Sequence, residues 1–68
     1  MLFNEWWDAA SPKQRRKLLQ RANFSLATSR DLDRWQARNY RNLVYEPGGL
    51  SHSDVYRMES LLKQDNVL

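Results

Sequence analysis

The segment that decides the fold of this chain spans residues 27–39 and reads A-T-S-R-D-L-D-R-W-Q-A-R-N. A short turn leads into a helix that Thr28 or Ser29 can cap with its side-chain hydroxyl. At about 100° per residue, Leu32 and Trp35 fall on one side of this helix, where a core would bury them. When the pattern continues beyond this segment, the arginines fall within roughly one quadrant of another side: Arg30, Arg34, Arg38 and Arg41. The segment therefore predicts a helix from about residue 28 to residue 41 with a core side and a cationic side.

The helix before this segment has the clearest start in the sequence. Ser11 stands at the N-cap, Pro12 at the first helical position and Gln14 three residues after the cap, which is the pattern of a capping box. Leu18, Leu19 and Ala22 form a buried stripe at helical spacing. Basic residues surround the stripe: Lys13, Arg15, Arg16, Lys17 and Arg21. The helix is expected to end near Asn23, and residues 24–27 are expected to form a turn.

Two further helices and one helix-breaking segment complete the predicted organisation. Residues 2–10 carry apolar side chains at helical spacing. A β-branched and an aromatic residue precede E-P-G-G at 46–49, which predicts a tight loop or a small β-hairpin over 44–50. An S-x-x-D cap at Ser51 starts the last helix, expected over 51–63.

The length of the chain sets the scale of the fold. A chain of 68 residues makes a single small domain, 1–68, whose core is small. We therefore predict an all-α fold, a compact bundle of about four short helices. Its parts are an aromatic helix over 1–10, a basic helix-turn-helix-like unit over 11–43, a loop or wing over 44–50 and a C-terminal helix over 51–63. The chain has no cysteine, so no disulfide framework or thiolate metal site is expected.

Positive charge is concentrated in the middle of the chain. From Lys13 to Arg41 there are nine basic and two acidic residues, a net charge of +7, whereas the rest has two basic and six acidic residues. Such a distribution indicates an anionic partner, with double-stranded DNA as the first candidate. The alternatives are an acidic protein surface and a merely solvated face. The candidate nucleic-acid-binding residues are Lys13, Arg16, Lys17, Arg21, Ser29, Arg30, Arg34, Arg38 and Arg41.

Aromatic residues are numerous for so small a core. The chain has three Trp, three Tyr and two Phe, so some of them can serve a partner or a dimer interface rather than the core. Adjacent tryptophans on a helix point about 100° apart, so one of Trp6 and Trp7 is expected in the core and the other at its edge or in an interface. The candidate protein-interface residues are Phe3, Trp6, Trp7, Tyr40 and Tyr45, with a core role as the alternative for each.

Several classes of function find no support in the sequence. No arrangement of Ser, His, Cys and acidic residues suits nucleophilic catalysis, and no phosphate-cradling glycine loop is present, so the chain is predicted not to be an enzyme. His52 is the single histidine, so no metal site and no cofactor are expected. Neither a signal peptide nor a run of about 18 apolar residues is visible, which predicts a cytoplasmic protein without a membrane partner.

Two segments resemble the winged helix-turn-helix of phage excisionases and MerR-type regulators. T-S-R-D-L-D-R-W at 28–35 is similar to their recognition helix, and G-G-L-S-H-S-D-V at 48–55 is similar to the step in which the wing returns and a capped helix begins. The turn lacks the glycine usual in such families, and Glu46 replaces a basic residue of the wing. The resemblance implies that Ser29, Arg30, Asp33, Arg34 and Arg38 face the DNA groove.

Two functional hypotheses follow. The first is a small DNA-binding regulator or architectural factor of phage or mobile-element type, which reads DNA through the helix over 28–41 and forms a homodimer through an aromatic or C-terminal helix. The alternative is a small phage-type inhibitor or adaptor that binds a host protein through arginine and aromatic side chains.

Overall fold

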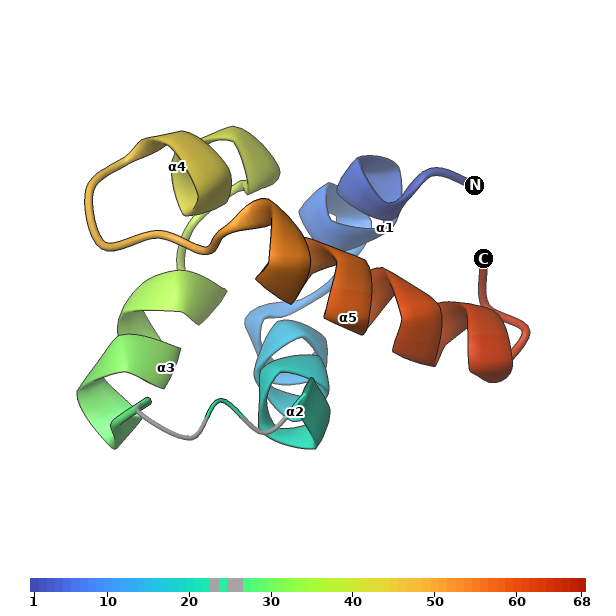
Figure 1. Ribbon diagram of the computed structural model, residues 1–68, viewed down its shortest axis with the longest axis horizontal. Coiled ribbons are helices and arrows are strands. Elements are labelled where there is room, and N and C mark those ends of the chain that lie inside the picture. Colours follow the sequence, from blue (N-terminus) through green and yellow to red (C-terminus); the bar gives the residue numbers. More distant parts are fainter. Residues whose placement is uncertain (23, 25–26) are drawn as a thin grey trace.

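The computed structural model of the chain describes residues 1–22, 24 and 27–68, and every regular element within these ranges is an α-helix (Figure 1). The described helices are α1 (Phe3–Ala9), α2 (Pro12–Ala22), α3 (Ser29–Gln36), α4 (Tyr40–Tyr45) and α5 (His52–Gln64). The prediction of an all-α fold is confirmed. The predicted number of about four helices is too low, because the helix expected from residue 28 to residue 41 is divided in two. The end of α2 falls where it was expected, but Asn23 and part of the predicted turn lie outside the described residues.

Side-chain caps start the helices where the sequence predicts them. The Ser11 hydroxyl accepts from the Gln14 backbone N–H at 3.2 Å, and the Gln14 side-chain oxygen accepts from the Ser11 N–H at 2.9 Å. Equivalent reciprocal pairs start α3 at Thr28 and α5 at Ser51, so Thr28, rather than Ser29, is the cap of α3. Each pair satisfies amides that the first turn of a helix leaves without a partner.

The break between α3 and α4 corrects the prediction of one long helix. The Asn39 side chain accepts from the Asn42 N–H at 2.9 Å and caps α4. The Tyr40 N–H donates to the Asp8 carboxylate of α1 at 2.7 Å. These acceptors take amides that a continuous helix would bond to its own preceding turn. Of the predicted stripe, Arg30 and Arg34 therefore lie on α3, Arg38 lies in the segment between the two helices and Arg41 lies on α4.

The sequence left open a tight loop or a small β-hairpin over residues 44–50, and the structure has a turn there without a β-hairpin. Residues 44–45 complete α4, and the chain then turns back so that the Leu50 N–H donates to the Leu43 carbonyl at 2.8 Å. A Cβ on Gly49 would stand 2.0 Å from that same Leu43 oxygen. Only glycine fits at this position, because the turn brings two backbone segments into direct contact.

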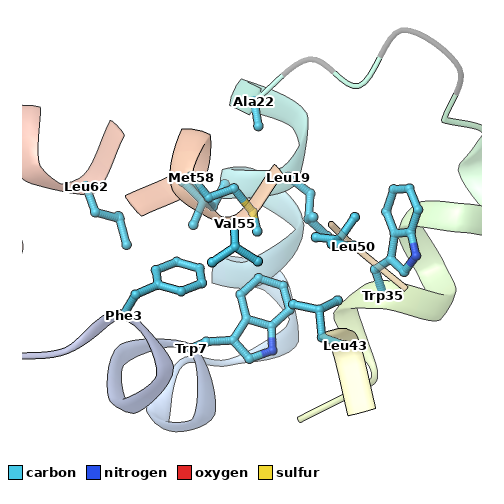
Figure 2. Packing of buried hydrophobic residues seen from close by; sticks show 11 residues of the cluster. Phe3, Trp7, Leu19, Ala22, Trp35, Leu43, Leu50, Val55, Met58 and Leu62 are labelled. Atoms are coloured by element: carbon cyan, nitrogen blue, oxygen red, sulfur yellow. The ribbon is translucent and has the colours of Figure 1, made fainter. Parts of the chain in front are cut away.

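The core gathers side chains from all of these helices and from the turn before α5 (Figure 2). Helix α2 packs against α3 and α5, and α1 packs against α4. The predicted stripe of α2 is buried, and so are Trp35 of α3 and three apolar side chains of α5. The buried apolar residues are Phe3, Trp7, Leu18, Leu19, Ala22, Trp35, Leu43, Leu50, Val55, Met58 and Leu62.

The two buried tryptophans use their indole N–H groups to hold the chain between helices. Trp7 Nε1 donates to the Arg38 carbonyl at 2.9 Å, which ties α1 to the segment between α3 and α4. Trp35 Nε1 donates to the Gly48 carbonyl at 2.8 Å, which ties α3 to the turn before α5. A buried indole needs such an acceptor, so both contacts fix the positions of the loops around the core.

Candidate nucleic-acid interface

Arg15, which is not among the predicted DNA-binding residues, is a structural arginine. Its Nε donates to the Trp7 carbonyl at 2.8 Å, and its Nη1 donates to the carbonyls of Gln36 and Arg38 at 3.1 and 3.2 Å. Its guanidinium lies 5.4 Å from the centre of the Trp7 ring. These acceptors stand at the C-terminal ends of α1 and α3, where helices leave carbonyls unsatisfied. Arg15 therefore holds these two helix ends together.

Arg16 joins α2 to α3. It forms an ion pair with Asp33, and its Nη2 donates to the Ser29 hydroxyl at 3.2 Å. Its side chain is only 27% exposed. The contact places the first turn of α3 beside α2 and neutralises one of the two aspartates that the sequence placed on the predicted recognition helix. Arg16 and Ser29 are thus engaged with each other rather than free for a partner.

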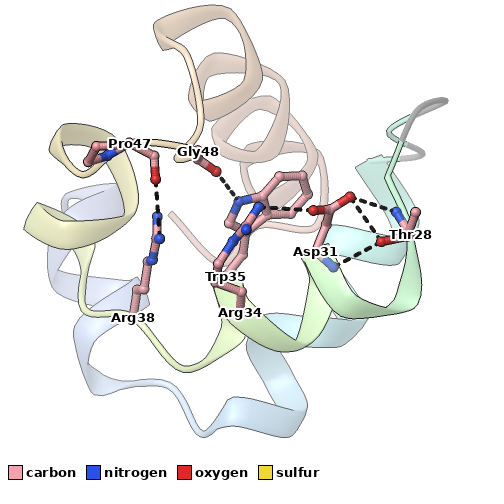
Figure 3. Close-up of polar contacts among 7 residues, drawn as sticks. All are labelled: Thr28, Asp31, Arg34, Trp35, Arg38, Pro47 and Gly48. Carbon is pink, nitrogen blue, oxygen red and sulfur yellow. Dashed lines mark hydrogen bonds and ion pairs between the residues drawn. The ribbon is translucent and has the colours of Figure 1, made fainter.

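Arg34 and Arg38 also make contacts within the chain (Figure 3). Arg34 Nη2 donates to the Asp31 carboxylate at 2.9 Å. Arg38 Nη2 donates to the Pro47 carbonyl at 3.3 Å, and its Nε lies 3.5 Å from the Glu46 carboxylate. The Arg38 side chain is 14% exposed, so it serves to anchor the turn before α5.

Asp31 is the acceptor around which α3 begins. The Thr28 backbone N–H donates to its carboxylate at 2.9 Å and the Thr28 hydroxyl at 3.1 Å. These hydrogen bonds, followed by the charges of Arg34 and Arg30, hold the pKa of Asp31 below its ordinary value. Asp31 therefore stays ionised and stabilises the start of α3. A negative charge at this end of a helix also interacts favourably with the positive end of the helix dipole.

Arg21 lies at the other end of α2. Its two Nη groups donate to the two carboxylate oxygens of Asp65, which follows α5. The longer of these two hydrogen bonds measures 3.4 Å. The contact ties the C-terminal ends of α2 and α5 together. Arg21 therefore shares its charge with a carboxylate, unlike the lysines on the outer side of the same helix.

The remaining predicted cations are exposed and belong to none of the ion pairs among the described residues: Lys13, Lys17, Arg30 and Arg41. Lys13 and Lys17 line a shallow open depression of about 360 Å³ on the outer side of α2, together with Arg16 and Gln20. The sequence holds no acidic residue between Asp8 and Asp31. Helix α2 itself therefore contributes no negative charge to its outer face.

The first turn of α3 borders this α2 face. Because Arg16 contacts both the Ser29 hydroxyl and the carboxylate of Asp33, the start of α3 lies next to the depression, and Arg30 follows Ser29 directly. Arg41 belongs to α4, which packs on α1 instead. We call the cationic surface of Lys13, Lys17 and Gln20, with the exposed Arg30 on the adjacent first turn of α3, the α2 face.

The predicted protein-interface residues divide between core and surface. Phe3 and Trp7 are buried, so they present no side-chain surface to a partner. Trp6 and Tyr40 are partly buried at the edge of the core, and Tyr45 is 77% exposed. Tyr56, which the sequence analysis did not single out, is 70% exposed on α5. Helical spacing places Tyr56 on the side of α5 away from Val55, Met58 and Leu62. Its exposure could therefore have been predicted from the sequence.

Comparison of the chain with protein-family models, with curated proteins and with solved structures found no match. Across residues 1–22, 24 and 27–68, no helix is long and apolar enough to cross a membrane. No group of three or more His, Cys, Asp or Glu side chains in the same ranges could hold a metal ion.

Proposed function

We propose that this chain is a small double-stranded-DNA-binding module, a regulator or architectural factor, whose α2 face contacts the phosphate backbone. The observation that carries the proposal is the pair of exposed lysines, Lys13 and Lys17, on a helix without acidic residues. A single exposed lysine on a solvated surface attracts anions only weakly. Two of them one helical turn apart, next to the turn of α3 that carries Arg30, raise the local concentration of anions.

The shape of the α2 face suits a phosphate backbone better than a small anion. The depression is shallow and open, so it cannot enclose a free ligand, but it can lie along an extended polyanion. Lysine ammonium groups bind phosphate as point charges and need no fixed geometry. Such contacts position a protein on DNA and make its affinity depend on salt.

Helix α3 is the element that we propose to approach the bases. Arg30 lies in its first turn on the exposed side, and Arg34 follows one turn later. The Arg34 side chain is 44% exposed in its pair with Asp31, and pairs near the surface contribute about 0–1 kcal/mol, so a phosphate or a guanine edge can replace the carboxylate. Arg38 has no part in this proposal, because its side chain anchors the turn before α5.

Fluorescence anisotropy of a labelled duplex, measured against the purified chain at about 50 and 200 mM salt, tests the proposal. Binding in the micromolar range that weakens steeply with salt is the expected result. Absence of binding at the lower salt concentration would reject a DNA-binding role.

A protein-binding role is a second proposal, and a different surface carries it. The arginines that the inhibitor hypothesis would use against a partner are mostly paired within the chain, whereas Tyr45 and Tyr56 are exposed on α4 and α5. Tyrosine is enriched in protein interfaces, because its ring buries apolar area while its hydroxyl stays hydrogen-bonded.

A further inference from the structure

An open groove of about 550 Å³ runs between the start of α4 and the first half of α5. It shares no residue with the α2 face. Two tyrosines, one histidine, one serine, one carboxylate and one apolar side chain determine its chemistry. The groove is lined by Tyr40, His52, Ser53, Val55, Tyr56 and Glu59.

The ring of Tyr40 is held in a fixed position at one wall of the groove. Phe3 contacts it edge-to-face with ring centres 6.0 Å apart, and its backbone N–H is bonded to the Asp8 carboxylate. Burial raises the pKa of the Tyr40 phenol, and the nearby Tyr45 and Glu59 raise it further. The phenol is therefore neutral at physiological pH and lies within electrostatic reach of the Glu59 carboxylate.

Glu59 is the negative charge of the groove, and it already accepts a cation. Lys63, one turn later on α5, places its Nζ 3.0 Å from the Glu59 carboxylate. A pair of this kind on the surface of a helix is weak and exchanges readily with other cations. The structure thus contains an internal example of the interaction that a partner's basic side chain would make.

We propose that this groove binds an arginine side chain from a basic segment of a partner protein. The guanidinium can donate to Glu59 while its flat face lies against the ring of Tyr56 or Tyr40, and its methylene groups can cover Val55. Arginine fits better than lysine, because a planar guanidinium stacks on aromatic rings and donates in two directions at once. The carboxylate repels phosphate, so the groove and the α2 face select opposite charges.

Titration of the isotope-labelled full chain with the peptide acetyl-Gly-Arg-Gly-Arg-Gly-amide, followed by NMR, tests this proposal. The expected result is a set of saturable shift changes confined to the amides of the groove residues. The same peptide with citrulline in place of arginine is the matched control, because citrulline keeps the shape and loses the charge. It should produce no such changes.

Substitutions then separate the groove from other surfaces. Glu59→Gln should weaken peptide binding about fivefold, through loss of the charged hydrogen bond. Tyr56→Leu should weaken it about threefold, through loss of the ring. Tyr45→Leu removes an equally exposed tyrosine that does not line the groove, so it should leave the affinity unchanged. Far-UV circular dichroism of each variant verifies that the helices are intact.

Three results would overturn the proposal. The first is equal binding of the citrulline peptide, and the second is an unchanged affinity in the Glu59→Gln variant. The third is a shift of the groove signals with protein concentration in the absence of peptide, which would identify a second copy of the chain as the occupant. Failure of DNA binding has no bearing on these outcomes, because the peptide test uses no DNA.

Discussion

Replacing Lys13 and Lys17 together with glutamine should flatten the salt dependence of DNA binding without unfolding the chain. Both side chains are exposed and belong to none of the ion pairs among the described residues. Glutamine is a good helix former, and exposed substitutions of this kind change stability by about 0.5 kcal/mol or less. A loss of binding in the double variant would therefore reflect the lost charges rather than a lost fold.

The expected size of the effect follows from the number of phosphates that the α2 face can neutralise. Each phosphate contact makes the negative slope of log affinity against log salt concentration steeper by about 0.9. With Lys13, Lys17 and Arg30 engaged, the slope is about −2.7, and affinity falls about 40-fold between about 50 and 200 mM salt. With Arg30 alone, the slope is about −0.9 and the fall is about 3.5-fold.

Anisotropy titrations of one duplex at several salt concentrations provide both slopes. Lys63→Gln is the control, because it removes a positive charge from the side of α5 that carries Glu59 and leaves α2 untouched. Its slope should equal that of the unmodified chain. If the double variant kept the full slope, the phosphates would be bound elsewhere and the assignment of the α2 face would be refuted.

Two further predictions concern the fold. Gly49→Ala should destabilise the chain by about 3 kcal/mol, because the new Cβ would meet the Leu43 carbonyl oxygen, whereas Gly48→Ala should cost about 1 kcal/mol, mainly through its positive φ. Urea unfolding measures both, and equal losses would show that the turn relaxes around the clash. Asp31 makes stability depend on pH: because its folded pKa is lowered, its contribution is present above its ordinary pKa of 3.8 and is lost as the pH falls through the lowered value. Thermal unfolding between about pH 5 and pH 2 should therefore show a smaller acid loss in Asp31→Asn than in the unmodified chain, and an identical loss would exclude this role.

The starts of α2, α3 and α5 and the buried stripe of α2 follow from local sequence alone. The caps at Ser11, Thr28 and Ser51 join groups only three residues apart, so the sequence specifies both partners of each hydrogen bond. The apolar positions of α2 recur at the helical period, and the structure buries them as predicted.

Tertiary structure decided where the predicted long helix breaks and which arginines stay free. The break depends on Asp8 accepting from the Tyr40 amide, a contact between residues that are distant in sequence. Arg30 and Arg38 fall about 80° apart, within the quadrant predicted to be cationic, yet Arg30 is exposed and Arg38 anchors the turn before α5. Such differences arise because an ion pair or a carbonyl contact needs two segments in place at once, and helical periodicity describes only one segment at a time.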